Sequence, residues 1–230
     1  MNSTQHPVGP AVDAAPARRP APVTLEGRFA VLEKLDPARH GRPFWEAVRG
    51  DDSLWTYLGY GPFDDEAAFL TWVAARAEAG DPFAYAVVER GSGAAIGSLT
   101  LMEIRPAMRV IEMGNIVYSS ALQRTPAATE AQYLAAAYVF ETLGYRRYEW
   151  KCNALNVPSR RAALRLGFAF EGIFRQHMIV KGRNRDTAWY SMLDSEWPAR
   201  RSAFEQWLDP SNFDSSGRQR VALAAFAASG

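Results

Sequence analysis

The stretch of sequence that decides the fold spans residues 118–131 and reads Tyr118-Ser119-Ser120-Ala121-Leu122-Gln123-Arg124-Thr125-Pro126-Ala127-Ala128-Thr129-Glu130-Ala131. It joins a β-type run, Val110 to Tyr118, to a long apolar helical pattern from Pro126 to Leu143. Thr125 is a typical N-cap, and proline is favoured at the first helical position. A strand, a loop of small residues and a helix N-terminus place several free N–H groups around one point. The passage therefore predicts a site for a pyrophosphate.

Strand and helix patterns alternate on both sides of this stretch, which predicts a mixed α/β sheet. The strand from Val110, the helix after it and the strand ending at Ala154 predict a right-handed βαβ unit with one parallel strand pair. Strand patterns cover residues 23–32, 83–88, 95–102, 110–118, 148–154, 168–180 and 187–193. The first of these contains a Glu26-Gly27 turn, and the last two flank a polar turn at 181–186. Helical patterns cover residues 37–48, 65–79, 126–143, 158–166 and 198–208.

The two ends of the chain differ from its middle. Residues 1–22 are rich in Pro and Ala with few large apolar side chains, so we expect a flexible arm there. Residues 23–197 form the predicted domain, and 198–230 a C-terminal helix and tail.

Composition excludes several classes of protein. The chain has 230 residues, 48% of them hydrophobic, which is typical of a globular domain. A net charge of +1 without a basic run argues against nucleic acid as a partner. The single cysteine and three scattered histidines offer no metal motif, so we expect no metal. No apolar segment is long enough for a membrane span, and we expect a cytoplasmic protein without a membrane partner.

Four pieces in order resemble the GCN5-related N-acetyltransferase (GNAT) superfamily, in the branch that includes ribosomal-protein alanine N-acetyltransferases. The resemblance covers about residues 23–197. Its first two pieces are the loop from Gln123 to Thr129 followed by Glu130-Ala131, and Asn153-Ala154-Leu155-Asn156 with the pattern Asn156-x-x-Ser159. The other two are Leu164-Arg165-Leu166-Gly167-Phe168 and Phe170-Glu171-Gly172. It implies an α/β (α+β) fold with a mixed, mostly antiparallel central sheet, a parallel splayed pair, and helices on both faces. It also implies transfer of an acetyl group from acetyl-CoA to a primary amine by direct attack.

The resemblance further implies which residues hold acetyl-CoA. The backbone of Ile116, Val117 and Tyr118 pairs with the pantetheine arm, the loop residues Gln123, Arg124, Thr125, Ala127, Ala128 and Thr129 hold the pyrophosphate, and Asn156 and Ser159 lie beside the arm. Two alternatives stay open: a helix cap for Asn156 and Ser159, and a solvated side chain for Arg124. Pro126 replaces the family's central glycine and removes one N–H donor, a loss of about 0.5–1.5 kcal/mol.

Removing a proton from the acceptor ammonium requires a base near the cleft. Glu112 is our first candidate and Glu103 the second, each with the alternative of a solvated edge carboxylate. Tyr118, Tyr190 and Ser191 are candidates for the proton donor to the leaving thiolate, whereas we interpret His177 as a strand-face residue and Cys152 as a packing residue.

The acceptor pocket is predicted between the first two helices and the final hairpin. Trp55, Tyr57, Tyr60 and Trp189 are its candidate walls, with core packing as the alternative. We interpret residues 183–186 as a solvated hairpin end. The acceptor is a small molecule or a protein N-terminus, and the sequence does not decide between them. A catalytically silent acyl-CoA-binding or partner-binding module is the alternative function. Apolar strand edges and the tail after Trp197 are the predicted contacts of a homodimer.

Overall fold

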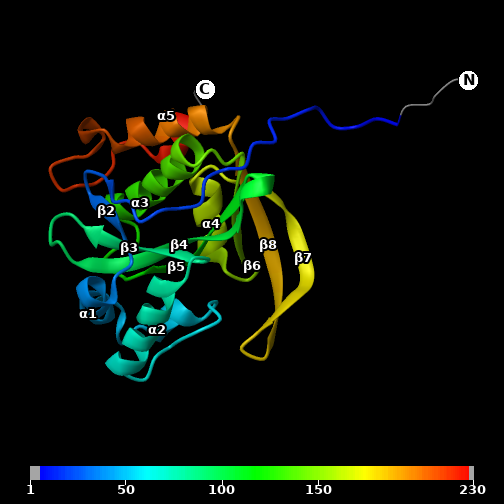
Figure 1. The fold of residues 1–230 in the computed structure, drawn as a ribbon. Coiled ribbons are helices and arrows are strands. Elements are labelled where there is room, and N and C mark those ends of the chain that lie inside the picture. The colour runs from blue at the N-terminus through cyan, green and yellow to red at the C-terminus, as the bar shows by residue number, and fades with distance from the viewer. Residues whose placement is uncertain (1–5, 228–230) are drawn as a thin grey trace, which may run out of the picture.

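The computed structural model describes residues 6–227, which form one eight-stranded sheet with helices on both faces (Figure 1). The strand order is β1-β2-β3-β4-β5-β6-β8-β7, and β5 and β6 are the parallel neighbours while every other pair is antiparallel. The predicted fold class is therefore confirmed. The strands are β1 (Leu25–Glu26), β2 (Ala30–Lys34), β3 (Phe83–Glu89), β4 (Ala95–Arg105), β5 (Val110–Tyr118), β6 (Arg147–Asn153), β7 (Ala169–Val180) and β8 (Arg183–Leu193).

Two groups of helices cover opposite faces of the sheet (Figure 1). One group packs over β2, β3 and β4, and the other covers the opposite face, so that two apolar cores flank the sheet. The first group is α1 (Pro37–Val48) and α2 (Glu66–Glu78), joined by the short helix η1 (Asp52–Trp55); the second is α3 (Pro126–Ala137), α4 (Val157–Arg165), α5 (Trp197–Leu208) and α6 (Leu223–Ala227).

Side-chain caps fix where the helices begin. Asp36 and Asp65 accept N–H bonds at the starts of α1 and α2, and Thr125 accepts from Ala128 N at 3.2 Å at the start of α3. Asn156 caps α4 through Ser159 N at 3.1 Å. Each cap satisfies a donor that the first helical turn leaves free. The predicted Thr125 cap and Pro126 first turn are confirmed.

The parallel pair separates part-way along its length. β5 and β6 pair from Val110↔Arg147 to Met113↔Trp150, and beyond that point β5 continues to Tyr118 and β6 to Asn153 without pairing to each other. The backbone edges that face each other there carry no ladder hydrogen bonds. This splay opens at the end of β5 that leads into the 118–131 stretch.

Three local features differ from the sequence-based expectations. The helical pattern predicted to reach Leu143 changes after Ala137 into a π-helical turn over Tyr138–Thr142. The polar turn predicted at 181–186 contains only Lys181 and Gly182, because β8 already begins at Arg183. Their φ angles of 49° and 71° match a tight primed hairpin turn, which brings the remaining polar residues into the strand.

Part of the segment predicted to be a flexible arm lies against the domain. Ala17 N donates to Pro106 O at 3.1 Å, and Arg18 N donates to Leu143 O at 2.9 Å. The hydroxyl of Tyr138 accepts from Ala21 N at 3.0 Å. Backbone bonds of this kind hold the segment from Ala17 onward, while residues 1–5 of the predicted arm lie outside the described part of the chain.

β7 forms one edge of the sheet and exposes several large apolar side chains, among them Ile173, Phe174 and Ile179. An edge of this kind can pair with another chain, and the homodimer stays a prediction. Within residues 6–227, no helix has the length and apolar character needed to cross a bilayer.

Candidate functional site

A bulge in β5 marks the point where the splay begins. The β4–β5 register passes from Ser98↔Val117 to Thr100↔Gly114, so β5 carries one extra residue there. Asn115 lies in this bulge with a left-handed φ of 50°, two residues after Met113, the last residue of β5 that pairs with β6. Bulges are common beside active sites because they redirect side chains and end strand pairing. This one separates the closed part of the β5–β6 pair from the open part.

The loop after β5 uses some of its own N–H groups. Ser119 O accepts from Leu122 N at 3.0 Å and from Gln123 N at 2.9 Å. Thr125 N donates to Leu122 O at 3.3 Å, and the Thr125 hydroxyl accepts from Ala128 N. The amides of Thr125 and Ala128, predicted to cradle the pyrophosphate, are therefore engaged within the loop.

Other N–H groups of the same loop remain available. Within residues 6–227, no hydrogen-bond partner is present for the N–H groups of Ser120, Ala121, Arg124 and Ala127. Arg124 is exposed and has a left-handed φ of 63°, which turns the backbone at the helix start. This set of donors, together with the Arg124 guanidinium, fits a pyrophosphate with fewer amides than the sequence predicts. Pro126 contributes no donor.

The remaining predicted donor-site residues have partners within the protein. Gln123 Nε2 donates to Tyr118 O at 2.8 Å, and Thr129 Oγ1 accepts from Arg165 Nη1 at 3.1 Å. Val117 is buried in the core against α1 and α2, so only its backbone faces the neighbouring strands. Ser159 Oγ accepts from Trp150 Nε1 at 3.0 Å. Together with the Asn156 cap described above, this bond fixes the start of α4 beside the splay.

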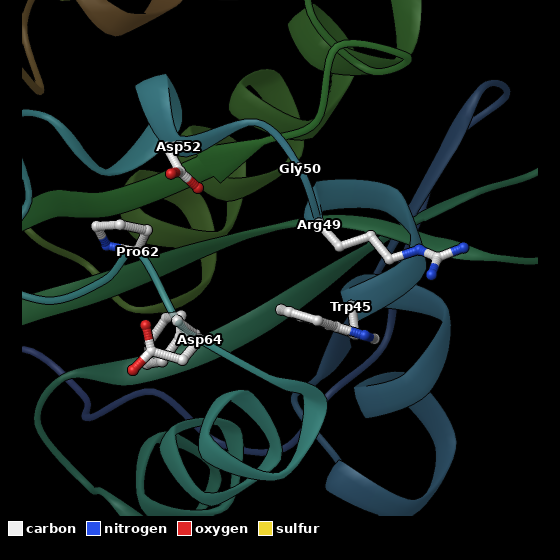
Figure 2. Close-up of a pocket in the computed structure, with 7 residues that line it drawn as sticks. Trp45, Arg49, Gly50, Asp52, Pro62 and Asp64 are labelled. Atoms are coloured by element: carbon white, nitrogen blue, oxygen red, sulfur yellow. The ribbon is translucent and has the colours of Figure 1, made fainter.

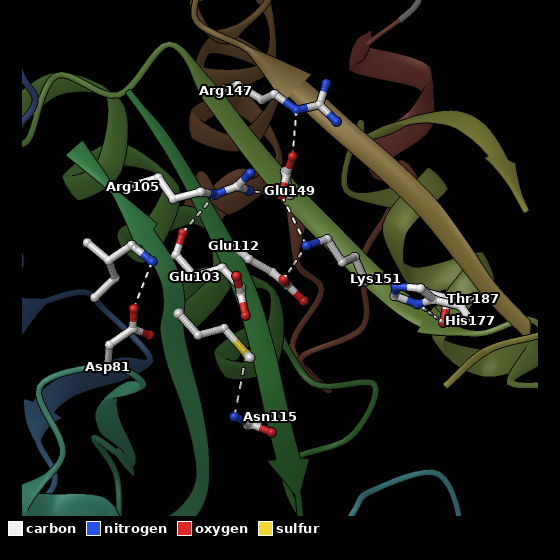
Figure 3. A network of polar contacts seen from close by, with 12 residues as sticks. Asp81, Glu103, Arg105, Glu112, Asn115, Arg147, Glu149, Lys151, His177 and Thr187 are labelled. Atoms are coloured by element: carbon white, nitrogen blue, oxygen red, sulfur yellow. Dashed lines mark hydrogen bonds and ion pairs between the residues drawn. The ribbon is translucent and has the colours of Figure 1, made fainter. Parts of the chain in front are cut away.

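The sheet face opposite α3 and α4 carries a buried ion-pair network across β5 and β6 (Figure 3). Lys151 Nζ lies 2.8 Å from Glu112 Oε2 and 3.2 Å from Glu149 Oε2. The Lys151 ammonium also sits 4.1 Å from the centre of the Trp189 ring. The side chains of Glu112, Glu149 and Lys151 are 7%, 4% and 12% exposed. A single ammonium is therefore shared by two buried carboxylates.

Arginines complete the network on the side of Glu149. Arg105 Nη2 and Arg147 Nε donate to Glu149 at 2.5 and 2.8 Å, and Arg147 also binds both carboxylate oxygens of Glu171. Burial alone would raise the pKa of Glu149, but the Arg147 hydrogen bond and the nearby cations hold it below its ordinary value. Glu149 is thus an ionised carboxylate with cationic partners besides Lys151.

Glu112 has the opposite character. Burial raises its pKa above the ordinary carboxyl value, the Lys151 ammonium opposes that rise, and the charges of Glu149 and Glu103 add to it. Glu112 stands one residue before the end of the β5–β6 pairing, opposite Glu149. A carboxylate with a raised pKa beside the splay is a stronger base than a solvated one. Glu103 lies exposed on β4 with a left-handed φ of 47°.

The two tyrosine candidates for the proton donor are held away from this network, whereas Ser191 is joined to it through Glu171. The Tyr118 hydroxyl accepts from Gln132 Nε2 of α3 at 2.7 Å, and burial raises its pKa. The Tyr190 hydroxyl accepts from Arg160 Nε at 3.2 Å on the face that α4 covers. Ser191 Oγ donates to Glu171 Oε1 at 2.7 Å. The structure therefore brings Glu112 to the open face but places the two tyrosine hydroxyls on the other face.

The predicted acceptor residues lie in different environments. Trp55 is 3% exposed and packs in the aromatic core between α1 and α2, so its side chain is not a pocket wall. The Tyr57 hydroxyl donates to Leu155 O at 3.2 Å, which links the α1–α2 loop to the loop after β6. Tyr60 donates to Asn115 Oδ1 at 3.3 Å beside the β5 bulge. Trp189 faces the open side through its contact with Lys151.

The β7–β8 hairpin closes over this face. Lys181 Nζ at its tip donates to the carbonyl of Trp55 at 2.9 Å. The α1–α2 loop therefore contacts both the hairpin and the end of β6. A hollow of about 610 Å³ lies apart from the splay, because its walls come from residues 45–64 alone (Figure 2).

Cys152 is buried on β6, and burial raises the pKa of its thiol, which suits the predicted packing role. Among residues 6–227, no three His, Cys, Asp or Glu side chains are grouped to hold a metal ion.

Sequence reasoning missed Asn115 and Lys151. Gly114-Asn115 inside a strand pattern is a usable signal for a bulge. Lys151 alternates with the buried Trp150 and Cys152 along β6, which indicates that it projects from the other face of the sheet. Nothing in the sequence pairs Lys151 with Glu112, because that contact joins residues far apart in the chain.

Residues 31–169 match the model of the acetyltransferase (GNAT) domain family. The chain belongs to this family. It is 48% identical to a GCN5-related N-acetyltransferase from Brucella melitensis, covering 94% of this chain and 99% of that one with a TM-score of 0.92.

A probable GNAT-family acetyltransferase from Chromobacterium violaceum is 43% identical, covering 85% of this chain and 100% of that one with a TM-score of 0.78. A ribosomal-protein-S5-alanine acetyltransferase from Vibrio fischeri shares the GNAT fold at 17% identity, with coverages of 76% and 98% and a TM-score of 0.59. No curated protein sequence matches the chain.

Proposed function

We propose that this GNAT protein transfers an acetyl group from acetyl-CoA to a primary amine in a ternary complex. The observation that carries the proposal is the splay beyond Met113↔Trp150, whose open backbone edges lead to the free amides of the 119–127 loop. Pantetheine pairs with the open edge of β5 at Ile116 to Tyr118, and the loop amides with Arg124 hold the pyrophosphate. Asn156 and Ser159 flank the arm from the start of α4.

Glu112 is the proposed base. Its carboxylate lies at the closed end of the splay and is already paired with one ammonium, that of Lys151, at 2.8 Å. Glu149 offers Lys151 a second carboxylate, so an acceptor ammonium can approach Glu112 while Lys151 stays neutralised. Glu112 then takes one proton from that ammonium, and the free amine attacks the thioester carbonyl. Glu103, exposed on the neighbouring strand, is the second candidate.

The acceptor is a small-molecule or peptide amine that lies on the open face. Tyr57, Tyr60 and Trp189 border this face, and the hairpin tip at Lys181 covers it from the other side. We place the reaction in the cytoplasm, where acetyl-CoA and a reduced Cys152 are both expected.

The test is a transfer assay with acetyl-CoA and a panel of primary amines: an alanyl tripeptide, a seryl tripeptide, spermidine and phenethylamine. Released thiol measures turnover, and mass spectrometry of the amine detects the added acetyl group. Glu112→Gln is the matched variant, expected to lower kcat about 10²- to 10⁴-fold. If Glu112→Gln transfers acetyl groups with the wild-type kcat, Glu112 is not the base.

A silent CoA-binding module is the second candidate, favoured by Pro126 and by the loop amides that bond within the loop. It predicts binding of acetyl-CoA with no acetylated product from any amine of the panel.

A further inference from the structure

His177 sits on a bulge of β7 that directs its ring to the open face. The β7–β8 register runs from Phe174↔Thr187 to Met178↔Arg185. Between these two pairs β7 advances by four residues and β8 by only two. Gln176 takes a left-handed φ of 50°, and Asp186 Oδ1 accepts its N–H at 2.7 Å. A non-glycine residue held in this conformation is uncommon and clusters at functional sites.

The imidazole is fixed through one nitrogen. His177 Nδ1 lies 3.0 Å from Thr187 Oγ1, and Arg185 Nε donates to the same oxygen at 3.2 Å. Thr187 is fully buried, which keeps this anchor in place. In the part of the chain that the structure describes, Nε2 of His177 has no hydrogen-bond partner.

The ring belongs to the same face as the Glu112–Lys151 pair. It contacts Phe174 edge-on at 5.6 Å and lies 5.9 Å from the Trp189 ring, whose centre is 4.1 Å from Lys151 Nζ. Figure 3 shows His177 and Thr187 next to Lys151. Thr187 pairs with Asn153, the last residue of β6 at the open splay.

We propose that His177 is a second catalytic residue, which moves a proton from the attacking nitrogen to the leaving sulfur. The inference rests on the proposed acetyl transfer. It fills the role that Tyr118 and Tyr190 cannot fill from the covered face, and an imidazole both accepts and donates protons near neutral pH.

The proton count requires two separate transfers. The acceptor ammonium gives its first proton to Glu112, and the amine lone pair then forms the C–N bond. His177 Nε2 takes a second proton from that nitrogen and returns it to sulfur as the C–S bond breaks. The products are the acetylated amine and CoA thiol, and Glu112 releases its proton to solvent. This sequence needs the tautomer in which Nδ1–H is donated to Thr187 Oγ1.

The strand of His177 and the three strands beyond it in the sheet carry charged groups. Arg175 lies on β7, Arg185 and Asp186 on β8, Lys151 on β6 and Glu112 on β5. The pH dependence of the variant is therefore compared with that of a control on the same strand, Met178→Gln, which leaves all of these charges in place.

The first test is chemical rescue of His177→Ala with acetyl-CoA and the amine of the panel that the wild type acetylates fastest. We expect kcat to fall about 10²- to 10³-fold with acetyl-CoA affinity unchanged, and added imidazole to restore part of the rate. Met178→Gln is expected to keep the wild-type rate. His177→Gln is expected to change the pH dependence of kcat, whereas Met178→Gln is expected to keep that of the wild type.

The second test needs no turnover. Two-bond ¹H–¹⁵N spectra of the histidine rings, with His177→Gln to assign the signal, are expected to show the Nδ1–H tautomer in the wild type and a changed tautomer population in Thr187→Val. A resting Nε2–H tautomer overturns the inference.

The outcomes separate the inference from the proposed function. In one outcome, the wild type transfers acetyl groups while His177→Ala keeps a kcat within threefold of the wild-type kcat and gains nothing from imidazole. That result overturns the role of His177 and leaves acetyl transfer standing. Absence of transfer by the wild type overturns the proposed function and this inference with it.

Discussion

Replacing Lys151 by methionine tests whether this ammonium sets the charge of Glu112. The substitution keeps the unbranched apolar stem and removes the charge 2.8 Å from Glu112 Oε2. Glu149 keeps Arg105 and Arg147 as partners, so the loss falls on Glu112. Removing an opposite charge at this distance raises a carboxyl pKa by about 1–3 units, and each unit corresponds to about 1.4 kcal/mol.

The sign follows from the direction of the shift. The folded pKa of Glu112 is already raised by burial and rises further in Lys151→Met. A carboxyl whose pKa is higher in the folded than in the unfolded state lowers the free energy of unfolding when it ionises. This loss of stability grows as the pH rises through the folded pKa. Relative to the wild type, we expect a loss of about 1.4–4 kcal/mol at pH 8 and a much smaller loss near pH 4.

Urea unfolding of wild type and variant at a series of pH values measures this difference. Lys151→Arg, which keeps the charge, is the matched control. The double variant Glu112→Gln/Lys151→Met is expected to regain most of the stability at pH 8, because it leaves no unpaired buried charge. A penalty that is constant from pH 4 to 8, or that the double variant retains, would refute the reasoning.

Three further predictions concern the donor loop, the fold and the ion-pair network. Pro126→Ala restores one N–H at the start of α3, and we expect acetyl-CoA to bind about 2- to 10-fold more tightly by calorimetry, whereas equal affinity would show that this amide does not reach the ligand. Glu130 accepts from the backbone N–H groups of residues 28–30 at 2.6–2.8 Å, so Glu130→Gln is expected to cost about 2–4 kcal/mol of unfolding free energy in a urea titration; a loss below about 0.5 kcal/mol contradicts this. The hydrogen bond from Arg147 lowers the pKa of Glu171 to about 2. The stability from this pair is therefore present above the unfolded carboxyl pKa of about 4.3 and disappears as the pH falls toward 2, so the melting temperature of Glu171→Gln should lie below that of the wild type at pH 7 and approach it at pH 2.5.

Local signals in the sequence were sufficient for most of the fold. Thr125 and Pro126 mark the start of α3, and the predicted helix at 37–48 has the bounds of α1. The long pattern from Pro126 hid the change to a π-helical turn after Ala137, because apolar periodicity does not distinguish i→i+4 from i→i+5 bonding. Residues 183–186 were predicted as a turn because they are polar. Their place in β8 follows from pairing with β7, which the sequence does not reveal.

The site was less accessible to sequence reasoning than the fold. Glu112 could be placed on the strand that leads to the cleft, but its partner Lys151 comes from another strand and becomes visible only with the β5–β6 register. The direction of the Tyr118 hydroxyl depends on the Asn115 bulge, which reverses the alternation of side chains along β5. His177 reads as a simple strand residue until the β7 bulge is seen.

Calorimetric titration of the full chain with acetyl-CoA tests the central claim, a donor site between the splayed strands and the 119–127 loop. We predict one-to-one binding near the micromolar range, weakened by Arg124→Ala. No binding at millimolar acetyl-CoA would contradict the account, because the proposed transfer has no acetyl donor without that site.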